Sequence, residues 1–173
     1  MKVLVTGTAG FIGSHVAQVL LGRGDEVIGF DNLNDYYDVS LKRARHQILL
    51  QSPAFTCEEG MLEDMPRLQA LCERDRPEII VHLAAHSHVV GDPLAFYRVN
   101  LLGTESLMEA IASSGIKLAK VLIASSANVY GNADHSPITE DEPLRPMNHY
   151  ALSKASMEQM LFKWQARLPI VIT

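Results

Sequence analysis

Short apolar segments alternate with helical segments along the chain, and this alternation limits the folds that it can adopt. Short β-branched runs predict strands at residues 2–6, 26–30, 55–57, 78–83, 120–125 and 169–173. Apolar residues at helical spacing predict helices at residues 11–21, 39–50, 65–73, 93–114 and 150–167, with a loop over 132–147. Strands that are apolar throughout and alternate with helices form a parallel sheet with both faces covered. Because crossovers are right-handed, we predict a doubly wound α/β sheet with strand order 3-2-1-4-5-6.

Three polar or glycine positions predict where helices begin and end. Asp92 and Pro93 form a good N-cap and first-turn pair for the helix over 93–114. Gly115 is expected to end that helix, and Ser40 is the expected cap of the helix over 39–50.

The composition is that of one ordinary globular domain. Of the 173 residues, 47% are hydrophobic and 20% are charged, and the net charge of −5 argues against a nucleic-acid-binding surface. The densest basic stretch, residues 41–46, is interpreted as a solvated helix face. No segment approaches the roughly 20 apolar residues of a membrane span. Cys57 and Cys72 lack the spacing of a disulfide framework, which favours reduced thiols and a cytoplasmic protein.

A glycine-rich turn follows the first predicted strand and opens the first predicted helix. The stretch "TGTAGFIG" has the spacing Gly7-x-x-Gly10-x-x-Gly13. The first glycine allows a tight turn, the second allows the backbone to approach a pyrophosphate, and the third allows close helix packing. The helix N-terminus then offers free N–H groups and a partial positive charge to phosphates. In this strand–turn–helix context, the spacing predicts a dinucleotide site.

An acidic residue, Asp31, follows the second predicted strand. It lies eighteen residues after Gly13, at the position where an acid binds the adenosine ribose hydroxyls of NAD. A 2′-phosphate would meet a like charge there, so NAD is favoured over NADP. The alternative is that Asp31 only caps the turn "DNLND". Because ligands of doubly wound sheets bind at the carboxyl ends of strands, Gly7, Asp31, the "AAHSH" stretch and the Ser125–Ser126 pair are expected to line one crevice.

The stretch "YALSK" places Tyr150 and Lys154 four residues apart, on one face of a helix. A free tyrosine is a poor base at neutral pH, and lowering its pKa from about 10 to about 7 requires roughly 4 kcal/mol. A nearby ammonium and a cationic nicotinamide would supply favourable charge for this change. A hydroxyl from Ser126 would then hold the substrate oxygen while its proton moves. The alternative, a surface Tyr/Lys pair, is the less favoured interpretation beside the glycine turn, Asp31 and the serines.

Six motifs occur in the order and spacing of a known family: "VTGTAGFIG", "DNLND", "HLAAHSHV", "VNLLGT", "SSANVYG" and "YALSK". In these motifs the chain resembles the extended short-chain dehydrogenase/reductase family, and more narrowly its NAD-dependent nucleotide-sugar epimerases, dehydratases and reductases. The resemblance implies that residues 1–173 form an NAD-binding Rossmann domain. It also implies that a C-terminal substrate domain is largely missing from this chain.

The resemblance implies roles for individual residues. Tyr150 is then the catalytic base, Lys154 lowers its pKa and binds the nicotinamide ribose, and Ser126 is the catalytic hydroxyl. The expected NAD-binding residues are Gly7, Gly10, Phe11, Ile12, Gly13, Asp31, Asn32, Leu62, Leu83, Ala84, Ala85, Asn100, Ser125, Tyr150 and Lys154. The expected partners are a UDP- or GDP-hexose and a second copy of the chain, which would pack through the helices over 93–114 and 150–167.

Two subfamily resemblances point to different reactions. The stretch "DNLNDYYDVSLKRAR" resembles UDP-glucuronate 4-epimerases, whereas "ITEDEPLRPMNHYALSK" is closer to GDP-4-keto-6-deoxyhexose reductases. The adenine-binding stretch departs from the family pattern, because Met61 replaces an acid in "GMLED". Leu62 can still offer its backbone N–H there. The loop "HSHVVGDP" is also shorter than usual in the family.

The resemblance and the residues together predict an NAD-dependent 4-epimerase. NAD would take a hydride from sugar C4 while Tyr150 takes the hydroxyl proton, and the hydride would return to the other face of the turned keto sugar. The alternatives are a 4-ketosugar reductase that uses external NAD(P)H and a non-catalytic dinucleotide-binding module. Ala127 and Asn128 follow the serines where dehydratases carry carboxylates, so we expect no loss of water. No metal site is expected, although His86 and His88 lie two residues apart.

Overall fold

A six-stranded parallel sheet forms the centre of the computed structural model, which describes residues 1–87 and 92–173. Its strand order is β3-β2-β1-β4-β5-β6, so the predicted topology is confirmed. The strands are β1 (Lys2–Thr6), β2 (Glu26–Asp31), β3 (Phe55–Glu59), β4 (Ile79–His82), β5 (Lys120–Ile123) and β6 (Ile170–Ile172). All neighbouring strands pair in parallel, which brings their carboxyl ends to one edge of the sheet.

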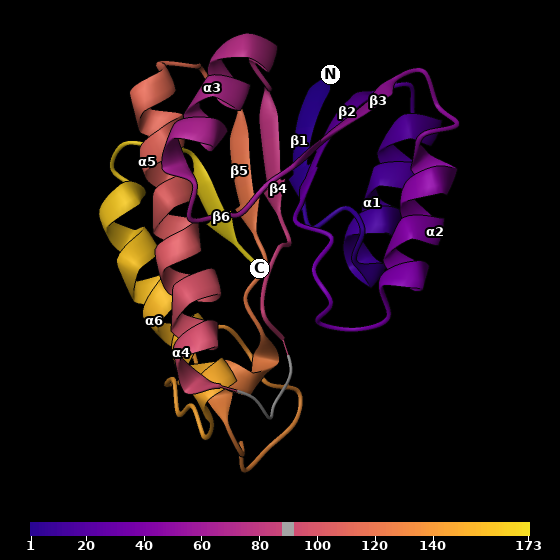
Figure 1. The fold of residues 1–173 in the computed structure, drawn as a ribbon. Coiled ribbons are helices and arrows are strands. Elements are labelled where there is room, and N and C mark those ends of the chain that lie inside the picture. Colours follow the sequence, from indigo (N-terminus) through magenta and orange to yellow (C-terminus); the bar gives the residue numbers. More distant parts are fainter. Residues whose placement is uncertain (88–91) are drawn as a thin grey trace.

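Helices cover both faces of this sheet (Figure 1). Helices α1 and α2 lie on one face, and α3, α4, α5 and α6 lie on the other. The helical segments are α1 (Phe11–Gly22), α2 (Val39–Leu49), α3 (Met65–Asp75), α4 (Pro93–Phe96), η1 (Tyr97–Gly103), α5 (Thr104–Ser114), η2 (Ala127–Tyr130) and α6 (His149–Trp164). Because strand side chains alternate between faces, Val3 and Val5 join the α1 side of the core while Leu4 joins the α5 side.

The predicted long helix over 93–114 is continuous in space but contains a π-helical segment, η1. The Thr104 hydroxyl donates to the Asn100 carbonyl (2.7 Å), which is the acceptor that an α-helix would use for the Thr104 N–H. Asp92 caps this helix through the Leu94 N–H, and Gly115 ends it with φ +64°, as predicted. The predicted Ser40 cap is wrong: Asp38 is the N-cap of α2 and accepts from the Ser40 N–H.

The glycine turn packs backbone against backbone. A Cβ added at Gly13 would lie 2.0 Å from the Gly7 carbonyl oxygen, so only glycine allows α1 to start this close to the end of β1. Gly7 has φ +78°, and a Cβ there would also lie 2.8 Å from the Ala84 nitrogen. These two glycines therefore fix α1 and the chain after β4 around the end of β1.

A buried histidine links β1, β4 and α5. The Thr104 hydroxyl donates its proton to the Asn100 carbonyl. Toward His82 it can therefore only accept, and its partner is Nε2–H of that ring (2.9 Å). His82 Nδ1 is then the acceptor for the Thr6 hydroxyl (2.8 Å), which in turn accepts from the Ala84 N–H. The neutral ring therefore satisfies both of its nitrogens. Burial, together with the charge of Lys154, lowers the pKa of His82 to about 3.

We expect His82 to lower the free energy of unfolding as the pH is decreased. The unfolded chain protonates His82 near pH 6.5, whereas the folded chain keeps the ring neutral down to about pH 3. Between these values the free energy of unfolding should fall by up to about 1.4 kcal/mol per pH unit from this residue. Urea unfolding of the wild type and of His82→Gln at pH 7, 6 and 5 measures the difference in slope. Equal slopes would contradict the assignment, and His15→Gln, at an exposed histidine, is the matched control.

Candidate active site

One cavity of about 520 Å³ lies at the carboxyl ends of the strands. Its wall is formed by the glycine turn after β1, the acid at the end of β2, the chain after β4, the chain after β5 and the start of α6. These segments are distant in sequence and meet because the strands are parallel. The cavity therefore lies at the edge of the sheet where the sequence predicted a ligand.

Most residues predicted to bind cofactor line this cavity. They are Gly7, Gly10, Phe11, Ile12, Gly13, Asp31, Asn32, Leu62, Leu83, Ala84, Ala85, Ser125, Tyr150 and Lys154. Asn100, which was predicted to bind NAD, does not line the cavity. Ser126, which was predicted to be the catalytic hydroxyl, does not line it either. The structure thus brings the glycine turn and the Tyr150–Lys154 pair into one continuous space.

Asn100 is buried and directs its side chain at the protein backbone. Its Oδ1 accepts from the His86 N–H (2.8 Å), and its Nδ2 donates to the His86 carbonyl (3.0 Å). Nδ2 also donates to the Ser153 hydroxyl (2.9 Å). Asn100 therefore joins the chain after β4 to α6, and all of its polar side-chain atoms have protein partners.

Asp31 organises the backbone on both sides of the cavity mouth. One carboxylate oxygen accepts from the Ala9 N–H in the glycine turn, and the other accepts from the Leu33 N–H, both at 2.9 Å. The alternative role as a turn cap is thus present in the structure. Each carboxylate oxygen has two lone pairs, so both retain acceptor capacity toward the cavity.

Two basic residues of α2 line the cavity, which corrects the interpretation of residues 41–46 as a solvated helix face. Lys42 is only 5% exposed, and its ammonium donates to Asn34 and lies 4.8 Å from the centre of the Tyr37 ring. Arg45 donates to the Tyr37 hydroxyl (2.7 Å) and lies over the Phe11 ring. The i, i+3 spacing of this pair was visible in the sequence, but only contact with residues 34–37 and 9–11 turns it inward.

A row of aromatic rings lies beside the cavity. Tyr36 stacks on His86 at 4.2 Å between ring centres, His86 contacts Phe96 at 4.9 Å, and Phe96 lies 6.3 Å from Tyr150. The Tyr36 hydroxyl also accepts from the Ser87 N–H (3.0 Å). His86 is thus held between aromatic rings. Among residues 1–87 and 92–173 no cluster of three His, Cys, Asp or Glu side chains has metal-binding geometry, and His88 lies outside those ranges.

Tyr150 and Lys154 lie on the face of α6 that meets the cavity. Asn148 caps this helix by accepting from the Ala151 N–H (2.8 Å), which places Tyr150 in the first turn. Tyr150 is 9% exposed and Lys154 is 4% exposed. The Lys154 ammonium donates to the Ala124 carbonyl at the end of β5 (2.9 Å). Burial lowers the pKa of Lys154 to about 8, against the opposing effect of the Glu158 carboxylate.

The two neighbouring serines after β5 have different partners. The Ser125 hydroxyl donates to the Glu158 carboxylate on α6. The Ser126 side chain accepts from the Asn128 N–H (3.3 Å) and caps the short 3₁₀ helix η2. Both Ala127 and Asn128 are exposed in η2. Sequence analysis had not predicted η2 or the contact with Glu158.

The acid missing from "GMLED" is replaced by a different contact. Met61 is 44% exposed, and its sulfur accepts from the Asn32 amide at 3.4 Å. Leu62 is buried and lines the cavity next to this pair. Asn32 and Leu62 thus line the cavity, whereas Met61 is not among its lining residues and contacts it only through the Asn32 amide.

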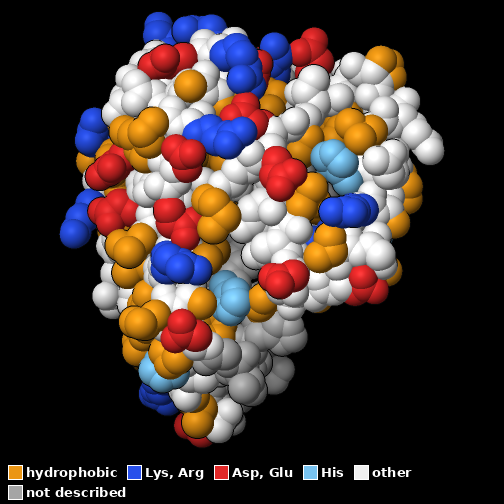
Figure 2. All heavy atoms as spheres, viewed as in Figure 1, with side chains coloured by type: hydrophobic (Ala, Val, Ile, Leu, Met, Phe, Trp, Pro, Cys, Tyr) orange, Lys and Arg blue, Asp and Glu red, His pale blue; other side chains and the backbone are white. Residues whose placement is uncertain are grey.

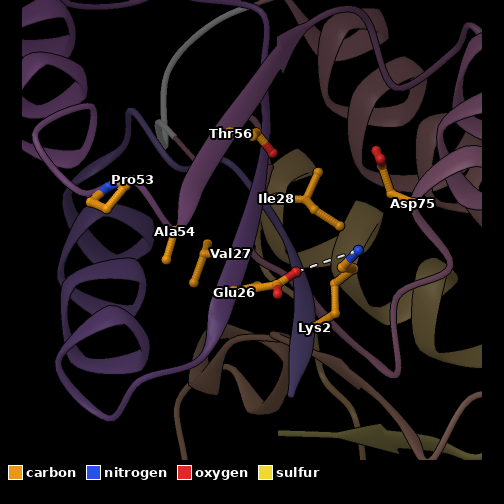
Figure 3. Close-up of a pocket in the computed structure, with 8 residues that line it drawn as sticks. All are labelled: Lys2, Glu26, Val27, Ile28, Pro53, Ala54, Thr56 and Asp75. Atoms are coloured by element: carbon orange, nitrogen blue, oxygen red, sulfur yellow. Dashed lines mark ion pairs between the residues drawn. The ribbon is translucent and has the colours of Figure 1, made fainter.

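A second hollow of about 400 Å³ lies at the opposite edge of the sheet (Figure 3). It is lined by the amino ends of β1, β2 and β3, where Lys2 and Glu26 face each other in an ion pair of 3.4 Å. Thr56 and Asp75 complete its wall. Because ligands of parallel sheets bind at the carboxyl edge, this hollow is not the candidate site.

In the described part of the chain, no helix has the length and apolarity needed to cross a membrane.

Known proteins resemble this chain both in sequence and in fold. A probable UDP-glucuronate 4-epimerase of Rhizobium meliloti (strain 1021) is 42% identical over 164 residues, which cover 92% of this chain and 48% of that protein. A UDP-glucuronic acid 4-epimerase from Bacillus cereus, in complex with UDP-glucuronic acid and NAD, superposes with a TM-score of 0.90 and 31% identity. This match covers 99% of the chain and 55% of the Bacillus cereus chain.

The dehydratases of nucleotide sugars share the same architecture. DesIV, a dTDP-glucose 4,6-dehydratase from Streptomyces venezuelae with NAD and TYD bound, superposes with a TM-score of 0.88 and 33% identity, over 99% of this chain and 54% of that one. The chain spans about half the length of the curated relatives and solved structures that it matches.

The family profile described as GDP-mannose 4,6 dehydratase matches residues 4–173, which is almost the whole chain. Its relatives include both 4-epimerases and 4,6-dehydratases. With the glycine turn, the acid at the end of β2 and the Tyr150–Lys154 pair around one cavity, the chain belongs to this family of extended short-chain dehydrogenases/reductases, the epimerases and dehydratases of nucleotide sugars.

Proposed function

We propose that residues 1–173 form the NAD-binding domain of a nucleotide-sugar 4-epimerase. The observation that carries this proposal is the single cavity that joins the glycine turn to Tyr150 and Lys154. A module that only binds a dinucleotide needs the glycine turn and the acid, but it has no need of a tyrosine and a buried lysine at the other end of the same space. The similarity to UDP-sugar 4-epimerases favours a UDP-sugar as substrate.

The residues of the cavity fit NAD. The backbone cradle at Gly7, Gly10 and Gly13 has no room for side chains, and it opens at the N-terminus of α1, where N–H groups favour a pyrophosphate. Asp31 and Asn32 offer acceptors for ribose hydroxyls at the end of β2. Lys42 and Arg45 line the same end and would interact with the negative charge of the dinucleotide.

The chain's own groups would perform the proton transfer. When bound, NAD supplies the oxidant for the alcohol carbon of the sugar. Tyr150 would take the proton of the sugar hydroxyl and later return it, as a positioned general base and acid. Lys154, one helical turn along the same face, would balance the charge left on the tyrosine oxygen. Ser126 would hold the substrate oxygen, with its hydroxyl proton available because the side chain acts as an acceptor toward Asn128.

Measurements can distinguish the proposed 4-epimerase from two alternative functions. A 4-ketosugar reductase would exchange its cofactor freely and consume NADH, whereas an epimerase retains its cofactor and consumes none. A non-catalytic module would bind NAD without turnover in the complete protein. The similarity to UDP-sugar 4-epimerases favours the epimerase.

The same proposal includes a homodimer in the cytoplasm. Leu94, Leu102, Leu152 and Phe162 are exposed apolar residues on α4, η1 and α6, the helices predicted to meet a second copy. In Figure 2, apolar side chains lie among charged ones over this helical side of the molecule. Cys57 and Cys72 are free thiols, which is consistent with a reducing compartment.

Asp31 should select NAD over NADP. Asp31→Ala removes a hydrogen-bond partner of the ribose, so the affinity for NAD should fall about tenfold or more. It also removes a charge that repels a 2′-phosphate, so the preference for NAD over NADP should become smaller. Calorimetry on the 173-residue chain with both cofactors measures this change. Asp31→Asn, which keeps a side-chain acceptor for the turn, should narrow the preference with a smaller loss of NAD affinity. Exposed Asp134→Ala is the charge-matched control, and equal wild-type affinities for NAD and NADP would overturn the prediction.

Tyr150 should carry the proton transfer. In the complete protein, Tyr150→Phe should lower turnover about 10²- to 10⁴-fold, the usual contribution of a positioned acid or base. NAD affinity should change much less. Steady-state rates with UDP-sugars and NAD binding by fluorescence measure the two effects. Tyr97→Phe removes a hydroxyl from the neighbouring helical segment and serves as the control; a Tyr150→Phe variant with a near wild-type rate would remove Tyr150 from the mechanism.

The complete protein should not eliminate water from its substrate. Elimination needs an acid and a base after the catalytic hydroxyl, but Ala127 cannot titrate and the Asn128 amide is no useful base at neutral pH. Mass spectrometry of products from UDP- and GDP-hexoses separates the outcomes. An epimer keeps its mass, a reduced ketosugar gains two hydrogens, and a 4-keto-6-deoxy product is lighter by one water. A dehydrated product formed at an ordinary enzymatic rate would contradict this proposal.

A further inference from the structure

The loop between β2 and α2 reaches across the mouth of the carboxyl-edge cavity through Tyr36. The Tyr36 ring stacks on the His86 ring with 4.2 Å between centres, and its hydroxyl accepts from the Ser87 N–H (3.0 Å). His86 and Ser87 follow β4, and β2 and β4 are the two neighbours of β1 in the sheet. These two contacts, called the Tyr36 bridge below, therefore join loops that stand on opposite sides of the β1 end.

The Tyr36 bridge lies at the rim of the cavity. Tyr36, His86 and Ser87 all line the cavity, and Ser87 is exposed, whereas Gly13 at the start of α1 is buried. The chains that follow β1 and β4 leave the sheet toward opposite faces, to α1 and to α4 (Figure 1). In doubly wound sheets a ligand binds where neighbouring chains diverge in this way. The bridge thus crosses the part of the cavity where a ligand is expected.

Both loops are anchored to the framework beside the bridge. Tyr37, the next residue after Tyr36, donates its hydroxyl to the Ala9 carbonyl in the glycine turn (3.3 Å). On the other side, Asn100 bonds to both the N–H and the carbonyl of His86 (2.8 and 3.0 Å). The backbone on each side is thus held in place. The part that can swing aside is the side chain of Tyr36, which is only half-buried.

The contacts of the bridge join one protein group to another, and neither of them requires a bound dinucleotide. Because the bridge is available to the free chain and to the loaded chain alike, it favours neither of them at equilibrium. A closed bridge nevertheless hinders the passage of a ligand in both directions. Loss of the bridge should therefore raise the rates of entry and release together and leave their ratio, the affinity, unchanged.

We infer that Tyr36 is a gate residue, which limits the rates at which NAD enters and leaves the cavity. The identity of the ligand rests on the proposed function, whereas the contacts of the gate do not. A tyrosine that acted only as a binding contact of NAD would slow release without slowing entry. The loss of such a contact would weaken binding, so the entry rate distinguishes the two roles.

The test is stopped-flow binding of NADH to the 173-residue chain, followed by NADH fluorescence, with release measured by displacement with excess NAD. Tyr36→Phe keeps the stacked ring but loses the acceptor for Ser87, so both rates should rise about fivefold. Tyr36→Ala loses both contacts, and both rates should rise about tenfold or more. The Kd of either variant should stay within about twofold of the wild type. Tyr97→Phe and Tyr97→Ala, at a half-buried tyrosine outside the cavity, are the matched controls.

Two results would overturn the inference. An unchanged entry rate with faster release would make Tyr36 a plain contact of the cofactor, and unchanged rates in both variants would deny it any part in exchange. His86→Ala removes the other ring of the bridge and provides a further check. Combined with Tyr36→Ala, it should give no further increase in either rate, because both changes break the same contact. Rates that multiply in the double variant would contradict the bridge.

Hydrogen exchange separates this inference from the proposed function. The Ser87 N–H bonds to the Tyr36 hydroxyl, so its exchange in the chain without cofactor should be about fivefold faster in Tyr36→Phe. Unchanged exchange at Ser87 would contradict the bridge. A wild-type chain that binds neither NADH nor NAD would contradict the proposed function and the ligand assigned to the gate, while exchange at Ser87 would still decide whether the bridge forms.

Discussion

The close approach of the glycine turn to the end of β1 is the constraint on which the rest of the site depends. Gly13 packs its backbone against the Gly7 carbonyl, where a single added carbon would lie 2.0 Å from that oxygen. Gly7 in turn contacts the backbone of Ala84, so one turn fixes the start of α1 and the chain after β4. The cavity follows from this packing, because the helix N-terminus and the β4 end form two of its walls.

Buried polar groups hold the other walls, and each has a defined partner. His82 is bonded to Thr6 and Thr104, Asn100 clamps the His86 peptide, and Asp31 accepts from two backbone N–H groups. Leaving any of these donors or acceptors unpaired in the interior would cost about 1–3 kcal/mol. The loops that shape the cavity are therefore fixed by hydrogen bonds to the framework, so the cavity is preorganised.

The end of the cavity at α6 combines a polar pair with an apolar enclosure. Tyr150 and Lys154 are both largely buried, and Phe96 and His86 lie beside the tyrosine. Low exposure strengthens the interaction between charges, but it also penalises the lysine ammonium. The Ala124 carbonyl and the Glu158 carboxylate are the groups that compensate this penalty. The exposed Ala127 and Asn128 add no titratable group here, and the proposal of an epimerase that eliminates no water depends on this feature.

The sequence by itself determined the sheet order, the glycine turn, the position of Asp31 at the end of β2 and the spacing of Tyr150 and Lys154. The glycine turn, Asp31 and the Tyr150–Lys154 spacing depend on residues close together in the chain, where periodicity and turn chemistry act, and the sheet order follows from the right-handedness of the crossovers. Tertiary structure alone decided that Lys42 and Arg45 turn inward, that Asn100 binds the His86 backbone, and that His82 lies between two threonines. It also decided that Ser125 and Ser126 point to different partners. Several of these contacts, such as Thr6 with His82 and Ser125 with Glu158, join residues that meet only when the parallel strands align, and a local pattern carries no information about partners so distant in sequence.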